Sequence, residues 1–205
     1  MPKEKVIEGL IIEPNQFPRK LRIENELSAF QKAVKGYIEC IDLPNGATII
    51  CNEEGKINDE PLNRILYDER GAIIDIVAGN MLIVGFDAEE GEFTSITEKQ
   101  AEKATEEFMQ PDMFFRTKDN IHMVNIGWQM NLVNDTDIIF TDPKTEEVKH
   151  SIVCDNDFEQ IRVFAFINGI RSEIARNMSC DTATIEISTN EKRNDFHLDF
   201  CDEER

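Results

Sequence analysis

The chain has 205 residues and a formal net charge of −19, with 41 Asp and Glu against 22 Lys and Arg. The acidic excess is spread over both halves of the chain. We therefore expect no direct binding to nucleic acid or anionic membranes, because such binding requires clustered Lys and Arg. No run reaches the ~18 apolar residues of a membrane span and MPKEKVIEGL lacks the apolar core of a signal peptide, so we expect a cytoplasmic protein.

The first half of the chain predicts strands and helices with well-marked boundaries. An apolar run ended by Pro14 indicates a buried strand, and Asn25 is expected to cap a helix whose apolar residues recur at three- and four-residue spacing up to Gly36. Two strands then meet at a Pro-Asn-Gly turn at 44–46, where glycine is free to adopt positive φ. The strands expected in this half are residues 5–13, 21–23, 37–43, 47–51, 73–77 and 81–86.

Two further helices are predicted in the same half. Pro61 in a first helical turn, followed by apolar residues, indicates a short helix that ends near Gly71. A longer helix begins at Thr97, where Gln100 completes a capping box, and stops before Pro111. Small alanines on its apolar face imply a close approach to a sheet.

The second half is interpreted as a separate unit that follows a linker at 110–119. Its expected strands are residues 121–132, 137–141, 148–154, 182–188 and 195–200. Asn156 and Glu159 resemble a capping box, which predicts a helix from about residue 157 to about residue 175. We therefore predict an α+β protein of two small domains, 1–110 and 111–205, each a mixed or antiparallel sheet with helices packed on one side.

An ordered set of short motifs runs through the first half. The motifs are GYIE at 36–39, NEEGK at 52–56, LNR at 62–64, a glycine and apolar strand ending in Val-Gly at 79–85, and a Ser/Thr-capped helix at 95–108. Over residues 5–109 this set resembles an uncharacterised domain family met mainly in phages, plasmids and integrative elements of Gram-positive bacteria. Similar domains often have a second glycine before GYIE, where this chain has Lys35. The resemblance implies no particular activity, but it implies an accessory protein of mobile DNA.

Candidate catalytic and metal-binding residues are few. The pairs His150/Cys154 and His197/Cys201 share an H-x3-C spacing, but both fall on predicted strands, where four residues separate the side chains by ~13 Å. The five cysteines form no CxxC pair, which suits a reducing compartment. The chain has no nucleophile elbow and no glycine-rich phosphate loop. We therefore assign no catalytic residue, metal ligand or cofactor.

The acidity of the chain carries the functional hypothesis. The predicted interaction residues are the carboxylates Glu39, Glu53, Glu54, Asp59 and Glu60. Arg64 is expected to be exposed and to pair with one of the many carboxylates. We expect a non-enzymatic accessory protein of a mobile genetic element that binds a host protein, namely a basic nucleic-acid-binding protein, and inhibits restriction or CRISPR defence as an acidic DNA mimic.

Two alternatives to this hypothesis stay open. The first is an enzyme or small-ligand-binding protein that uses a pocket between the two domains. The second is that the acidic surface serves solubility alone.

Overall fold

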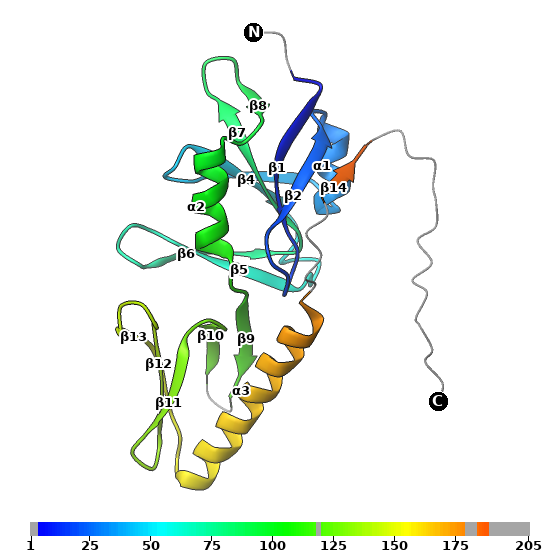
Figure 1. Cartoon of the computed structure of the whole chain (residues 1–205). Helices are drawn as coiled ribbons and strands as arrows, with labels where there is room; N and C mark the ends of the chain where they lie inside the picture. Colours follow the sequence, from blue (N-terminus) through cyan, green and yellow to red (C-terminus); the bar gives the residue numbers. More distant parts are fainter. Residues whose placement is uncertain (1–3, 118–119, 179–183, 189–205) are drawn as a thin grey trace, which may run out of the picture.

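The computed structural model describes residues 4–117, 120–178 and 184–188, and the structural statements below concern this part of the chain. Figure 1 shows an upper unit that contains α1, α2, β1 to β8 and β14, and a lower unit that contains β9 to β13 and α3. The predicted α+β class is confirmed. The strand predicted at 195–200 and the pair His197/Cys201 lie outside the described residues.

The upper unit is built around a mixed sheet in the order β14-β2-β1-β7-β4-β3, with β8 paired to β7. Its strands are β1 (Val6–Ile12), β2 (Arg19–Glu24), β3 (Ile38–Asp42), β4 (Ala47–Asn52), β7 (Met81–Asp87), β8 (Glu92–Thr94) and β14 (Ile185–Ile187). All pairs are antiparallel except β14 with β2. β1 has apolar side chains on both faces, with Ile7 and Ile11 on one face and Leu10 and Ile12 on the other. Such a strand is stable in the interior of a sheet that is covered on both sides.

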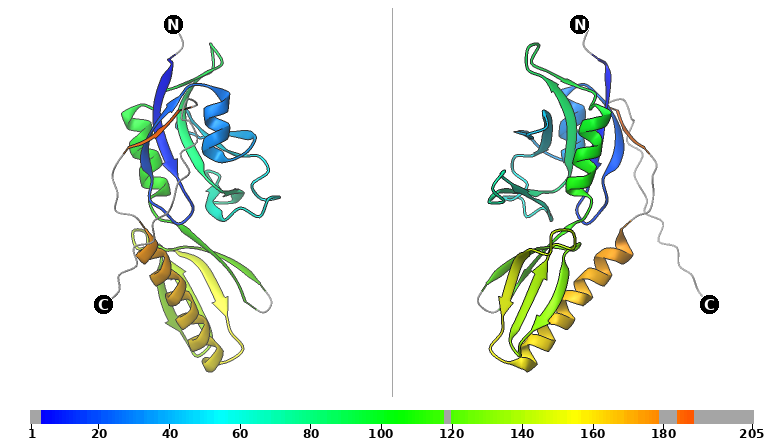
Figure 2. Two further views of the ribbon diagram at one scale, coloured as in Figure 1. Left: turned by 90° about the vertical axis from the view of Figure 1, so that its right-hand side faces the viewer. Right: turned by 60° about the vertical axis from the view of Figure 1, so that its left-hand side comes forward.

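Each face of this sheet is covered by one helix, whereas the sequence predicted helices on one side. α1 (Leu27–Val34) packs Phe30 and Val34 into the core on the Ile7 face. α2 (Glu98–Phe108) packs Ala104 and Phe108 into the core on the opposite face. The left view of Figure 2 shows the strands between the two helices.

The helix boundaries follow the sequence signals in part. The capping box of α2 is confirmed, since the backbone N–H of Gln100 donates to Thr97 Oγ1 at 3.3 Å and that of Thr97 donates to Gln100 Oε1 at 3.0 Å. α1 differs, because its N-cap residue is Glu26, without a side-chain cap. Asn25 is buried instead and donates from Nδ2 to the carbonyl oxygen of Phe93 at 2.8 Å.

The short helix predicted after Pro61 is wrong, because this segment forms β5 (Leu62–Tyr67) and pairs with β6 (Ile73–Ala78). The apolar residues Leu62, Ile65 and Leu66 lie three and four positions apart. This spacing fits a short helix and a strand that is buried on both faces equally well. The turn decides the outcome: Gly71 adopts φ 77, and the backbone N–H of Asp68 donates to the Ala72 carbonyl at 2.8 Å. Gly71 therefore closes a hairpin turn and does not end a helix.

The lower unit packs α3 (Asp157–Asn177) against five strands (Figures 1 and 2). The strands are β9 (Asp112–Arg116), β10 (Ile121–Asn125), β11 (Gln129–Val133), β12 (Asp137–Thr141) and β13 (Val148–Val153). β9 pairs with β10, and β11, β12 and β13 form a separate antiparallel sheet. The helix predicted from residue 157 is confirmed, with Asn156 Oδ1 accepting from the Glu159 backbone N–H at 2.9 Å.

Two predictions in this region are corrected. The expected linker contains β9, because the alternating side chains of Met113 and Phe115 are buried in the core of the lower unit. The single strand expected at 121–132 is two strands, β10 and β11. A turn separates them, in which Asn125 Oδ1 accepts from the Gly127 backbone N–H at 2.9 Å.

After α3 the chain returns to the upper unit, where β14 pairs parallel to β2 with Ile185 opposite Leu21. The domain limits 1–110 and 111–205 remain a prediction, and residues 185–187 contribute to the first sheet. No helix of the described residues is long and apolar enough to cross a membrane.

Candidate functional site

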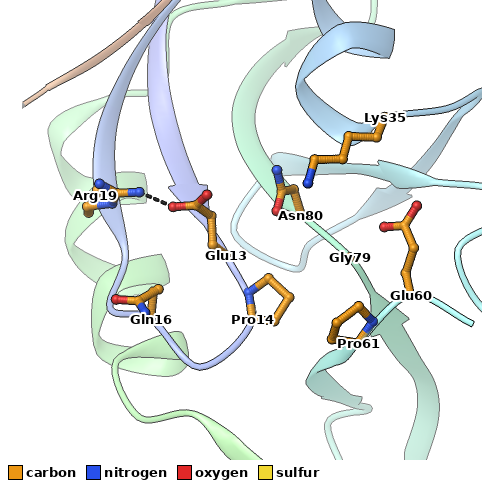
Figure 3. Close-up of a pocket in the computed structure, with 9 residues that line it drawn as sticks. All are labelled: Glu13, Pro14, Gln16, Arg19, Lys35, Glu60, Pro61, Gly79 and Asn80. Carbon is orange, nitrogen blue, oxygen red and sulfur yellow. Dashed lines mark hydrogen bonds and ion pairs between the residues drawn. The ribbon is translucent and has the colours of Figure 1, made fainter. Parts of the chain in front are cut away.

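A cavity of about 500 Å³ lies at the end of the first sheet, and Gly79 and Asn80 of the motif at 79–85 line it (Figure 3). Five segments line it: the turn after β1, the start of β2, the end of α1, the connection from β4 to β5, and the turn from β6 to β7. The lining residues are Glu13, Pro14, Gln16, Arg19, Lys35, Glu60, Pro61, Gly79 and Asn80. Its size falls within the ~300–1,000 Å³ of small-molecule sites.

Lys35 enters the cavity from an unusual backbone conformation. It is the residue that ends α1, with φ 63 in the left-handed region, a conformation that glycine adopts without strain. Its side chain extends from the end of α1 toward Asn80 (Figure 3). Asn80 is fixed by donating from Nδ2 to the Ala33 carbonyl at 2.9 Å. The turn geometry expected for a glycine is therefore kept while an ammonium group is placed at the cavity.

Glu60 lines the cavity and is held from two sides. Asn52 Nδ2 donates to Glu60 Oε1 at 2.6 Å, and Glu60 Oε2 lies over Gly79. Gly79 adopts φ 74, and a Cβ atom there would collide with that carboxylate oxygen. Glycine is thus required both by the backbone conformation and by the position of Glu60.

The remaining wall carries a second pair of charges. Arg19 and Glu13 form an ion pair, which Figure 3 shows as a dashed line. Arg19 Nε is buried and has no hydrogen-bond partner among the residues described. Two cations and two carboxylates therefore line a cavity of balanced charge in a strongly acidic chain.

Beneath the cavity lies a buried polar network that sequence reasoning missed. Arg64 was expected to be exposed, but only 1% of its surface is accessible. Its guanidinium donates to the carbonyl oxygen of Phe108 at 3.0 and 3.2 Å, to that of Gln16 at 2.7 Å, and to Asn63 Oδ1 at 2.9 Å. Burial lowers the pKa of Arg64 to about 10, so the side chain stays charged at neutral pH.

Asn63 extends this network to the strands of the first sheet. Its Nδ2 donates to the carbonyl oxygens of Ile12 at 2.8 Å and Gly79 at 2.7 Å. One signal in the sequence could have indicated this network: Asn63 and Arg64 stand between apolar residues. Polar side chains that are buried in a strand require hydrogen-bond partners. The LNR motif therefore has a structural role here: it fixes the turns that line the cavity.

The predicted interaction residues occupy one edge of the upper unit. Glu39 lies on β3, the last strand of the sheet, and Glu53, Glu54 and Asp59 lie on the connection that follows the neighbouring strand β4. These four side chains are exposed and make no hydrogen bond or ion pair with another residue that the structure describes. We call them the acidic edge. Glu60 is partly buried and belongs to the cavity instead.

The acidic edge acts on a neighbouring thiol. Cys51 is buried on β4 directly opposite Glu39, and burial together with the negative charge of Glu39 raises the pKa of Cys51 to about 12. Lys56, the one basic residue between 53 and 60, is paired with Asp75. The edge therefore exposes uncompensated negative charge to solvent.

A further cavity of about 680 Å³ lies between the upper and lower units. Its lining residues are Pro14, Asn15, Gln16, Leu62, Asp112, Met113, Phe114, Ile170, Glu173, Ile174 and Asn177. The units are joined beside it by Gln16 Nε2, which donates to the Asn177 carbonyl at 2.8 Å. Asp112 Oδ2 also accepts from the Ile65 backbone N–H at 2.9 Å.

Two of the histidines meet in the lower unit. His122 Nδ1 and His150 Nε2 lie 3.0 Å apart and share a hydrogen bond, and His122 Nε2 lies 2.9 Å from Thr117 Oγ1. Burial lowers the pKa of both imidazoles. Within 4–117, 120–178 and 184–188, no group of three or more His, Cys, Asp or Glu side chains is arranged to hold a metal ion.

The upper unit is thus an α+β domain that presents a polar cavity beside an acidic edge. Residues 7–109 match the domain of unknown function (DUF3846), and the chain belongs to this family. The predicted resemblance to an uncharacterised domain family is confirmed over this region. No curated protein and no solved structure matches the chain. The cavity and the acidic edge both lie within the matched residues.

Proposed function

We propose that this protein acts by binding, and that the acidic edge contacts a basic surface of a host macromolecule. The observation that carries the proposal is the exposure of Glu39, Glu53, Glu54 and Asp59 without a partner among the described residues. Unpaired carboxylates on one edge attract and orient a basic partner.

The motif resemblance implies a mobile-element setting, and this setting would make host defence proteins the relevant partners. The motif resemblance and the net charge of −19 support a role as an inhibitor of a DNA-binding defence protein. Duplex DNA carries about one negative charge per 1.7 Å of helix axis, and proteins that bind it carry matching Lys and Arg. In this proposal the carboxylates of the acidic edge compete for such a surface, as a DNA mimic does.

Charge reversal on the acidic edge tests the proposal. The tagged protein is used to capture partners from host extract at rising salt, and the triple variant E53K/E54K/D59K is compared with E89K/E102K/E106K. The control has the same change in charge at exposed carboxylates of the β7–β8 turn and α2. We expect a salt-sensitive partner to be lost with the first variant and kept with the second. Equal capture by both variants, or capture insensitive to salt, would contradict the proposal.

A cellular assay tests the anti-defence role separately. Phage infection is measured in cells that carry a restriction or CRISPR system, with and without the protein. Protection of the phage that disappears with E53K/E54K/D59K is expected. Absence of protection by the unmodified chain would reject the anti-defence role while leaving the binding role intact.

A second candidate function is binding of a small polar ligand in the cavity at the end of the first sheet. The observation that favours it is the balanced set of charges around about 500 Å³, with Lys35 and Glu60 on one side of the cavity and the Arg19–Glu13 pair on the other (Figure 3). A thermal-shift screen with free amino acids and nucleotides tests it. Stabilisation by a compound that is lost in Lys35→Ala supports this function, and no stabilisation by either class rejects it for these ligands.

A further inference from the structure

A second concave surface lies at the far end of β3, between the β5–β6 hairpin and α2. We call it the β3–α2 groove, and its volume is about 520 Å³. The lining residues are Ile41, Asp42, Leu43, Pro44, Asn45, Leu66, Tyr67, Asp68, Glu69, Ile74, Lys103 and Glu107. Every one of them lies within the family-matched region.

The floor of the groove is apolar. Leu66 is buried there, while Tyr67 and Ile74 remain 40% and 60% exposed. These two side chains come from the paired strands β5 and β6, whose turn is fixed by Asp68 Oδ1 accepting from the Ala72 backbone N–H at 2.8 Å. The apolar side chains are therefore presented by a hairpin with a hydrogen-bonded turn.

The rim of the groove is acidic. The acidic lining residues are Asp42, Asp68, Glu69 and Glu107, and Lys103 is the one basic lining residue. Asp42 accepts from Thr48 Oγ1 and Asp68 accepts from backbone N–H groups of its turn, which leaves Glu69 and Glu107 as the carboxylates available to a ligand. Glu107 makes no hydrogen bond or ion pair with another residue of the described ranges, and burial raises its pKa. A cation from outside the chain would stabilise this carboxylate.

We propose that the β3–α2 groove receives a segment of the basic partner in which an apolar side chain is flanked by Lys or Arg. This inference rests on the proposed function, because it takes the partner of the acidic edge to be basic. Glu39 and Ile41 alternate along β3 and therefore lie on the same face, so the groove, which Ile41 lines, is next to the acidic edge.

The two surfaces would contribute differently to binding. Exposed charges accelerate association and are screened by salt, because the Debye length is ~8 Å at physiological ionic strength. An apolar side chain that fills a groove adds affinity that salt does not remove. The groove would therefore supply the part of the binding that persists at high salt.

Two synthetic peptides separate these contributions. Both carry four Lys or Arg residues, and the central residue is Leu in one and Ser in the other. Fluorescence anisotropy measures their binding to the full chain, to Ile74→Ser, and to Ile121→Ser. Ile121 is 67% exposed on β10 and serves as the control for loss of an exposed isoleucine.

We expect the Leu peptide to bind about tenfold more tightly than the Ser peptide, as burial of one aliphatic side chain predicts. Ile74→Ser should remove this difference at both low and high salt, whereas Ile121→Ser should keep it. Equal affinity of the two peptides for the unmodified chain would overturn the inference. Sedimentation without peptide checks for a second copy as the occupant, and self-association that Ile74→Ser abolishes would also overturn it.

Failure of the groove and failure of the acidic edge give different results. If the Ser peptide binds the full chain but not E53K/E54K/D59K, the proposed role of the acidic edge is supported. This holds whether or not the Leu peptide binds more tightly than the Ser peptide. If neither peptide is affected by E53K/E54K/D59K, the proposed function fails for these peptides.

Discussion

Replacement of Arg64 by methionine tests the buried network that supports the cavity. Methionine fills a similar volume but removes every donor, so the carbonyl oxygens of Phe108 and Gln16 lose their bonds from the guanidinium at 2.7 to 3.2 Å. The Phe108 carbonyl belongs to the last turn of α2, where no intrahelical partner is available. A buried acceptor left without a donor costs ~1–3 kcal/mol, so the two carbonyls together predict a loss of about 3 kcal/mol in the free energy of unfolding.

Urea denaturation followed by circular dichroism measures this loss, and a thermal scan checks it. A change of 3 kcal/mol corresponds to a fall of about 6–12 °C in the melting temperature of a chain of this size. Arg70→Met is the control, because Arg70 is exposed in the β5–β6 turn and should change stability by less than ~0.5 kcal/mol. A loss below ~1 kcal/mol in the free energy of unfolding of Arg64→Met would refute the conclusion that this guanidinium provides the needed hydrogen bonds to the Phe108 and Gln16 carbonyl oxygens.

Three further changes follow from local geometry, each measured by chemical denaturation. Lys35→Gly should raise the free energy of unfolding by ~0.5–1 kcal/mol, because glycine adopts φ 63 without strain; a loss of stability would contradict the left-handed conformation. Gly79→Ala should lower the free energy of unfolding by ~1–3 kcal/mol, because residue 79 has positive φ and the added Cβ displaces the Glu60 carboxylate. An unchanged free energy of unfolding would contradict this packing. Burial lowers the folded-state pKa of His122 and His150 below 6.5, so the unfolded chain takes up protons first as the pH falls. The stability that the neutral pair contributes is fully present above about pH 6.5 and is lost as the pH falls through the lowered folded-state pKa. The variant H122Q/H150Q should lack this part of the pH dependence. Identical pH profiles of stability for the variant and the unmodified chain would contradict the prediction.

The strands and helices that the sequence predicted correctly have strong local signals. The Thr97/Gln100 capping box and the Pro-Asn-Gly turn at 44–46 depend on neighbouring residues alone, and both are present in the structure. The segment after Pro61 could not be assigned in this way, because its apolar spacing fits both a helix and a strand, and the strand depends on pairing with residues 73–78 outside the segment. Short apolar runs without a diagnostic period are decided by such contacts.

The candidate site was predicted less completely than the fold. The acidic residues could be chosen from the sequence because carboxylates at predicted turns are usually exposed, and four of the five are. Glu60 differs because Asn52 and Gly79 fix it in the cavity. Neither the cavity nor the groove was visible in the sequence, because each combines segments that are distant along the chain.

Hydrogen–deuterium exchange of the complex with the captured partner locates the contact surface directly. If the acidic edge binds the partner, amides in residues 38–42 and 53–60 should become protected, while those of α3 and β10 in the lower unit should exchange as in the free protein. Protection confined to the lower unit, with residues 38–42 and 53–60 unchanged, would contradict the proposed role of the acidic edge.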